Sequence, residues 1–314
     1  MISAHRFLTQ PPESWDDATL ARMERAFFND LVLPSGATKS TEAGRLATVD
    51  AFFLDQIQPT GLSPRRFLDV AVSSGITTDE WLSSLHTALG ETAGLSMTGS
   101  DLTPKAWLVE FPLGLRVLVD RAMRPLQFDL GGLAWSGACR RPSHYLTGCP
   151  VWRALARGLW GRVTAELSLA GKFPLTADRP LVCLGGRVTV REVSLLSRRL
   201  RHGAVLRVEE EDLMAPGFPE WAGAFDVIRV ANLLHPCYFP LERLKQGLEV
   251  LARRLHAPGG LLLLARTVEA RGAPPRNEAT LFRLDEAGRL VAAGRLNGGV
   301  EVEPLVLALA PIFR

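Results

Sequence analysis

The stretch from Phe67 to Gly75 constrains the fold of this chain more than any other. An apolar run begins at Phe67 and ends in the acid Asp69. Small residues follow at the second, fourth and sixth positions after this acid: Ala71, Ser73 and Gly75. A polar run compatible with a helix begins at Ile76. This order predicts a buried parallel strand, a tight turn with little side-chain bulk, and the N-terminus of a helix. A ligand can lie close to the backbone of such a turn.

Further apolar runs predict more strands of a parallel sheet. The run Leu95–Asp101 also ends in an acid, and a carboxylate at the tip of a neighbouring strand can accept hydrogen bonds from both hydroxyls of a ribose. Thr103 and Pro104 then predict the capped start of a helix. The later predicted elements are strands over Val205–Asp212 and Phe225–Asn232, a helix over Leu241–Leu255, a break at Pro258–Gly260, and a strand over Leu261–Ala265.

This series resembles the class I S-adenosylmethionine (SAM) dependent methyltransferases over residues 61–102 and 200–314. The most distinctive part is the run Phe225–His235, followed by a helix, the Pro258–Gly260 turn and an apolar strand. The resemblance implies an α/β fold with a Rossmann-like, doubly wound, seven-stranded sheet, and SAM as cofactor. The family usually has glycine at all three small positions of the turn, whereas Ala71 and Ser73 replace two of them here.

The resemblance also implies a set of cofactor contacts. In chain order they are Asp69, Ala71, Ser73, Gly75, Asp101, Leu102, Asp212, Leu213, Ala231 and Asn232. Within this set, Asp69 would help to position the methionine end, and Asp101 would bind the ribose. The pair Asp212–Leu213 would flank the adenine, and the pair Ala231–Asn232 would line the floor near the sulfonium.

Candidate bases for methyl transfer are few. The transfer is an in-line displacement in which the protein supplies position, a dry pocket and, in some enzymes, a base. His235 follows the fourth predicted strand, at the edge where the methyl group should project, so it is a candidate catalytic base. Tyr238 is a second polar candidate. The alternative for His235 is a hydrogen-bonding role at the start of a helix.

Nucleic acid is not expected as the acceptor. The pair Pro236–Cys237 resembles the nucleophile motif of enzymes that methylate C5 of pyrimidines, but it lies several residues beyond the strand end. The motif that holds exocyclic amines of bases is missing, because Asn232 is followed by two leucines.

Two segments flank or interrupt the resemblance. Residues 1–60 are expected to form an N-terminal helical cap, with apolar residues at helical spacing in Trp15–Leu33 and Glu42–Gln56. A cation where the second helix begins, Lys39 or Arg45, could pair with the carboxylate of SAM; a capped surface helix is the alternative. Residues 103–199 are expected to form an insertion that acts as a lid or substrate-recognition element.

The insertion and the C-terminal part carry their own patterns. Within the insertion, Leu115–Arg121 and Pro125–Leu130 predict a β-hairpin, and Tyr145–Ala170 predicts a helix. The aromatic residues Trp135, Tyr145 and Trp152 could line a pocket, with core packing as the alternative. Strands are expected over 278–283, 288–294 and 300–309.

Composition excludes several classes of protein. The 314 residues are 47% hydrophobic and 22% charged, with a net charge of +3, which gives no argument for a polyanionic partner. No run of about 18 apolar residues occurs, and the start lacks a secretory signal, so we expect a cytoplasmic protein. The cysteines have no pair at the two-residue separation of zinc sites, so no metal site is expected: Cys139, Cys149, Cys183 and Cys237.

The sequence therefore favours a SAM-dependent methyltransferase that acts on a small molecule, with secondary metabolism as the suggested setting. Two alternatives stay open. The acceptor could be a protein or peptide docked on the insertion. The chain could also be a non-catalytic binding module that keeps the fold, which the replacements at Ala71 and Ser73 would permit.

Overall fold

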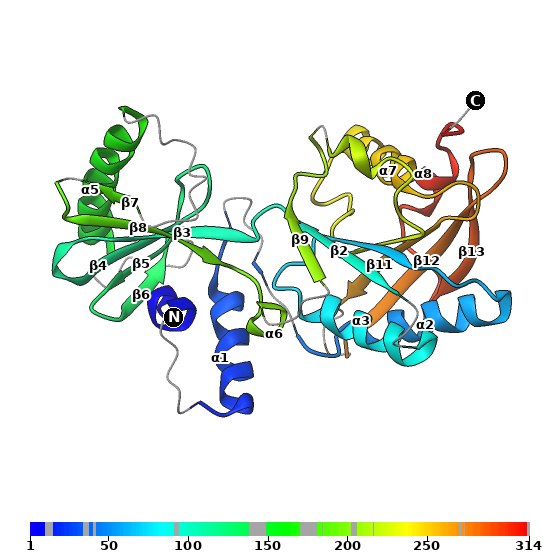
Figure 1. Ribbon diagram of the computed structural model, residues 1–314, viewed down its shortest axis with the longest axis horizontal. Coiled ribbons are helices and arrows are strands. Elements are labelled where there is room, and N and C mark those ends of the chain that lie inside the picture. Colours follow the sequence, from blue (N-terminus) through cyan, green and yellow to red (C-terminus); the bar gives the residue numbers. More distant parts are fainter. Residues whose placement is uncertain are drawn as a thin grey trace. The chain divides into compact units, whose positions relative to one another are not determined.

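The chain divides into two compact units in the computed structural model (Figure 1). The first unit comprises Met1–Thr41 and Thr103–Ser197, and the second comprises Glu42–Leu102 and Arg198–Arg314. The structure describes residues 1–9, 15–33, 38–39, 42–90, 94–137, 149–169, 181–183, 185–201, 206–215, 217–269, 272 and 274–312. The expected N-terminal segment 1–60 thus contributes to both units.

The second unit contains a seven-stranded mixed sheet in the order β13-β12-β11-β10-β1-β2-β9. Its strands are β1 (Arg66–Val70), β2 (Ser96–Asp101), β9 (Leu206–Glu210), β10 (Val227–Ala231), β11 (Leu261–Val268), β12 (Arg276–Leu284) and β13 (Leu290–Leu296). The five strands from β9 to β11 are parallel, and β12 and β13 are antiparallel to their neighbours. The predictions of these strands are confirmed.

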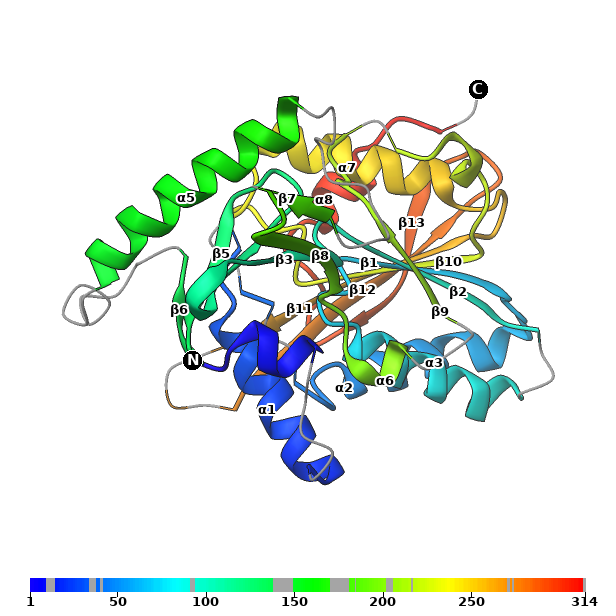
Figure 2. The ribbon, with the colours of Figure 1, turned by 60° about the vertical axis from the view of Figure 1, so that its left-hand side comes forward.

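Helices cover both faces of this sheet (Figure 2). On one face lie α2 (Ala47–Ile57) and α3 (Ile76–Leu89), and on the other lies α7 (Leu241–Arg254). Successive side chains of a strand point to opposite faces. Phe67 accordingly packs in the cluster with α2 and α3, whereas Leu68 packs in the cluster with α7. Burial on both faces explains the apolar runs of β1, β10 and β11.

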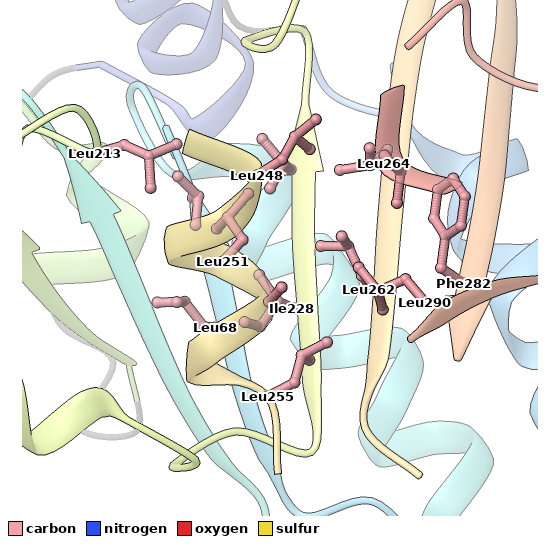
Figure 3. Close-up of a cluster of buried hydrophobic side chains, with 14 of the residues drawn as sticks. Leu68, Leu213, Ile228, Leu248, Leu251, Leu255, Leu262, Leu264, Phe282 and Leu290 are labelled. Carbon is pink, nitrogen blue, oxygen red and sulfur yellow. The ribbon is translucent and has the colours of Figure 1, made fainter. Parts of the chain in front are cut away.

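The cluster beside α7 shows how the helix is held (Figure 3). Leu248 and Leu251 of α7 point toward Ile228 of β10 and Leu262 of β11. All four side chains are fully buried. Full burial of each such side chain stabilises the fold by about 1.5–3 kcal/mol. The remaining helices of this unit are η2 (Gln58–Thr60), α6 (Arg198–Arg201), η5 (Pro219–Trp221) and α8 (Glu303–Leu307).

Two predicted elements were wrong. Residues 300–309 were expected to form a strand, but they contain α8. Val302 and Val306 are both buried and lie four residues apart, which suits one face of a helix. Thr103 and Pro104 were expected to start a helix, but β3 (Lys105–Glu110) follows them. The run Ala106–Val109 is buried, and β3 pairs in antiparallel fashion with residues 116–119 and 189–194.

The first unit contains a six-stranded antiparallel sheet in the order β6-β5-β4-β3-β8-β7. Besides β3, the strands are β4 (Leu115–Val119), β5 (Pro125–Leu130), β6 (Leu133–Ser136), β7 (Leu181–Cys183) and β8 (Val188–Ser194). Its helices are η1 (His5–Thr9), α1 (Asp17–Asp30), η4 (Pro112–Gly114) and α5 (Cys149–Leu169). The predicted hairpin is confirmed in β4 and β5, and the predicted helix is confirmed in α5.

The two faces of the six-stranded sheet are covered by different helices. Phe27 and Phe28 of α1 pack with Leu108 and Leu118, and Trp160 of α5 packs with the cluster of Val117. Trp135 of β6 stacks on Phe128 with ring centroids 6.0 Å apart, and it joins that core. Tyr145 and the side chain of Trp152 lie outside the described residues. Among the described residues, no helix has both the length and the apolar character needed to cross a membrane.

Candidate functional site

The turn between β1 and α3 has an alternating left-handed backbone. The φ angles of Ala71, Ser73 and Gly75 are 61°, 57° and 82°. The N–H of Val72 donates to the carbonyl of Ser100 at 3.1 Å, which attaches the turn to β2. A left-handed conformation costs a residue with a Cβ roughly 1–2 kcal/mol. Ala71 and Ser73 therefore carry this cost in the turn, whereas Gly75 adopts the conformation without it.

Asp101 lies beside this turn, at the end of β2. Its Oδ2 accepts a hydrogen bond from the backbone N–H of Ser73 at 2.8 Å. Its own carbonyl accepts from the N–H of Glu211 at 2.9 Å, at the end of β9. The Asp101 residue is half-buried, and the neighbouring Leu102 is 55% exposed. The structure thus brings Asp101 and the small-residue turn together, as the strand order requires.

Asp69 is buried and bound by protein groups. Its carboxylate accepts two hydrogen bonds from Arg229 of β10, at 2.9 and 2.6 Å, and a third from the Thr78 hydroxyl at 2.6 Å. The register pairs Asp69 directly with Arg229 on the adjacent strand. The role of Asp69 in this structure is to join β1, β10 and the start of α3. Its expected role beside the methionine end of SAM stays a prediction.

Arg229 binds a second carboxylate from α2. Its Nη1 donates to Asp50 at 2.6 Å, and its guanidinium carbon lies 4.2 Å from the ring centroid of Trp81. Burial raises the pKa of Asp50 to about 6, and the attraction of Arg229 opposes this rise only in part. Sequence reasoning missed this network. The available signal was an arginine inside the apolar run Val227–Val230 and an acid inside a helix with apolar spacing.

At the end of β9, the predicted adenine pair separates into an exposed and a buried residue. Asp212 is exposed, and its Oδ1 accepts the N–H of Met214 at 2.9 Å. Leu213 packs in the core beside α7. Glu211 forms a buried ion pair with Arg254 of α7 and so ties this strand end to the helix.

At the end of β10, Asn232 ties that strand to β11. Asn232 has a φ of 58°, and its Oδ1 accepts the N–H of Thr267 at 2.7 Å. Its own N–H donates to the carbonyl of Ala265 at 2.9 Å, and Ala231 precedes it half-buried. Asn232 therefore lies at the carboxyl edge of the sheet, next to the strand that carries the small-residue turn.

Both ring nitrogens of His235 are occupied. Nδ1 accepts the N–H of Cys237 at 2.9 Å, so the network assigns the ring proton to Nε2, which lies 3.1 Å from Glu301. Glu301 also pairs with Arg266 at 2.6 Å, and these two residues line a small hollow beside β10 and β11. The ring of Tyr238, which is 68% exposed, lies 5.5 Å from the His235 ring. Among the described residues, no group of His, Cys, Asp and Glu side chains is arranged to hold a metal ion.

Comparison with known proteins returns matches to solved structures, and those described below share 11–14% identity with this chain. No protein-family model matches the chain. No curated protein matches it. The matching solved structures include the CMeT domain of the citrinin polyketide synthase, at 14% identity and a TM-score of 0.34, where the match covers 72% of this chain and 35% of that chain.

Two N-methyltransferases also match. NodS from Bradyrhizobium japonicum WM9, solved with S-adenosylhomocysteine (SAH), shares 11% identity, with 77% of this chain and 72% of that chain covered and a TM-score of 0.33. The sugar N-methyltransferase KedS8 from Streptoalloteichus sp. shares 14% identity, with coverages of 82% and 72% and a TM-score of 0.31. This chain spans about a third of the solved CMeT-domain chain. Likeness at these TM-scores does not carry an activity to this chain.

Proposed function

We propose that this protein is a SAM-dependent methyltransferase that acts on a small molecule. The observation that carries the proposal is the turn Ala71–Gly75, whose alternate residues are left-handed, together with the carboxylate of Asp101 hydrogen-bonded to its backbone. Small residues let a ligand approach the backbone closely, and the turn opens directly into α3, whose N-terminus favours negative charge.

The residues at this edge fit a nucleoside with an amino-acid tail. A carboxylate has about four acceptor positions, so Asp101 can accept from ribose hydroxyls while it holds the turn. In this proposal the exposed Asp212 lies beside the adenine, and Ala231 with Asn232 forms the floor near the sulfur. SAM, when bound, supplies an activated methyl group. The protein contributes position and excludes water.

Proton removal from the acceptor is assigned to His235 in this proposal, with Tyr238 beside it. Nδ1 accepts a proton only after its bond to the Cys237 N–H opens, because Nε2 already carries the proton directed at Glu301. Both ring nitrogens of His235 already have partners within the protein. This observation favours the second candidate function, a module that binds SAM without transferring its methyl group. A peptide acceptor is a further alternative.

Calorimetry on the full chain tests the cofactor assignment. We expect the wild-type protein to bind SAM, and Asp101→Ala to weaken binding by about 10- to 100-fold, because a charge-assisted hydrogen bond contributes about 1.5–3 kcal/mol. Asp55→Ala, which removes an exposed acid of α2, is the matched control and should leave affinity unchanged. Absence of binding at millimolar SAM would exclude the enzyme, and unchanged affinity in Asp101→Ala would exclude the ribose assignment.

A turnover assay separates the enzyme from the binding module. SAH release is measured with SAM and a panel of small amines, acids and phenols. The enzyme predicts acceptor-dependent release that falls in His235→Gln while SAM affinity is kept. Tight SAM binding without release for any acceptor favours the module.

A further inference from the structure

The segment that leads into α2 is held by hydrogen bonds to both α3 and β12 of the second unit. The N–H of Gly44 donates to both carboxylate oxygens of Glu80 on α3, at 2.9 and 3.0 Å. The carbonyl of Arg45 accepts from Nδ2 of Asn277 at 2.8 Å, at the start of β12. The backbone of Arg45 is therefore held between the helix that follows the small-residue turn and the far side of the parallel strands.

The side chain of Arg45 is oriented as well. Its Nε donates to the hydroxyl of Thr267 at 3.3 Å, near the end of β11. That hydroxyl in turn donates to Oδ1 of Asn277 at 2.9 Å, and the N–H of Thr267 is held by Asn232. Thr267, which holds the Arg45 side chain, thus belongs to the same hydrogen-bond network as Asn232. Asn232 lies one strand away from the small-residue turn.

This arrangement leaves one side of the guanidinium available. Among the described residues, the two terminal NH₂ groups of Arg45 have no hydrogen-bond or ion-pair partner, and the residue is half-buried. Arginine presents its N–H groups as a planar fork that matches a carboxylate bidentately. A fork whose Nε is already fixed loses less side-chain entropy when it binds such a group.

We infer that Arg45, anchored by Thr267 at the carboxyl edge, is a binding residue for a carboxylate of the small molecules that occupy this site. The inference rests on the proposed function for the identity of those molecules. Two sources have the required chemistry: the carboxylate of SAM itself, and an acid group on the methyl acceptor.

The cofactor source is tested with SAM and decarboxylated SAM, which differ by the carboxylate alone. Calorimetry on the full chain compares wild type, Arg45→Ala and Arg45→Lys, with Arg283→Ala, an exposed arginine of β12, as control. If the carboxylate is that of SAM, Arg45→Ala weakens SAM by about 10- to 100-fold and leaves decarboxylated SAM within about twofold. Arg45→Lys, which keeps the charge without the fork, loses less and also serves if Arg45→Ala fails to fold.

The acceptor source is tested on the SAH-loaded protein with benzoate and benzamide, which have similar shapes and differ in charge. A preference for benzoate that disappears in Arg45→Ala, with unchanged SAM affinity, assigns the residue to the acceptor. If neither SAM affinity nor the benzoate preference depends on Arg45, the inference is overturned while the proposed function stands.

Failure of the proposed function is recognised separately. If the wild-type protein binds no SAM, the same benzoate and benzamide titrations are made on the cofactor-free chain. A benzoate preference lost in Arg45→Ala then supports a carboxylate site of another function, and no preference overturns both proposals.

Discussion

Arg229 has no exposed surface, and its guanidinium binds the carboxylates of Asp50 and Asp69. Two acids and one cation leave an excess negative charge in a buried site. The pKa of Asp50 is raised to about 6, because the effect of desolvation exceeds the attraction of Arg229. Asp69 and Glu80 add smaller repulsions that also raise this pKa. Asp69 keeps three hydrogen bonds, so the network holds the start of α3 against β1 and β10.

The raised pKa of Asp50 predicts a pH dependence of stability. Because the folded pKa of about 6 exceeds the ordinary aspartate value of 3.8, the folded state binds more protons between these values. The favourable contribution is therefore complete below about pH 4 and is lost as the pH rises to 6. Relative to Asp50→Asn, the wild-type free energy of unfolding should fall by about 2–3 kcal/mol over this window.

Urea unfolding at pH 4, 5, 6 and 7 measures this difference. Asp55→Asn, on the exposed side of the same helix, is the control and should follow the wild-type curve. Parallel curves for the wild type and Asp50→Asn would show that Asp50 titrates normally in the folded protein.

Between elements, the contact of α3 with α6 depends on Gly75. This residue precedes α3 with a φ of 82°, and a Cβ built there would lie 1.9 Å from Cδ1 of Leu200 on α6. The glycine therefore serves both the backbone conformation and the close approach of α6. Gly61, which follows η2, is also left-handed, with φ 65° and ψ 11°, but no atom lies within 4 Å of such a Cβ.

The pair of glycines separates these two effects. Gly61→Ala should lower the free energy of unfolding by about 1–2 kcal/mol through backbone strain alone. Gly75→Ala should lower it by about 1–3 kcal/mol more, because the added methyl group overlaps Leu200. In a double-mutant cycle measured by chemical denaturation, Leu200→Ala should remove the excess and leave the strain. Equal costs for the two glycines would contradict the packing argument.

Each of the two units has its own hydrophobic clusters, and the proposed cofactor residues all belong to the second unit. The first unit, with its six-stranded sheet and α1 and α5, contributes none of them. Its role as a lid or substrate-recognition element stays a prediction. This division makes the cofactor half of the proposal testable apart from the acceptor half.

A core substitution in the first unit should change stability without changing SAM affinity. Leu118→Ala removes a side chain that is 1% exposed in the cluster of α1, at a cost of about 2–5 kcal/mol. Calorimetry with SAM, at a temperature where the variant stays folded, should give a Kd within about twofold of wild type. A loss of tenfold or more in the folded variant would place part of the cofactor site outside the second unit.

The parallel strands and their helices were predictable from local patterns. Long apolar runs separated by glycine, proline and acids mark strands that are buried on both faces, and α7 has apolar residues at helical spacing. The first unit was less accessible, because β3 pairs with β8, which lies about eighty residues later. The dipeptide Thr103–Pro104 suits the start of a helix or a strand, and that pairing resolves the ambiguity.

Part of the candidate site was likewise predictable from local patterns, and part was not. The turn Ala71–Gly75 and the acid at the end of β2 were predictable from neighbouring residues, because the small residues lie between an apolar run and a run compatible with a helix, and the acid ends an apolar run. The surroundings of Asp69, Asn232 and Arg45 do not follow from neighbouring residues. Asp69 faces α2 and α3 because its strand pairs in register with a strand 160 residues later, where Arg229 lies opposite it. Pairing between distant segments depends on how the whole sheet assembles. The residue pattern of one segment indicates that it forms a strand, but it does not indicate which other strand pairs with it.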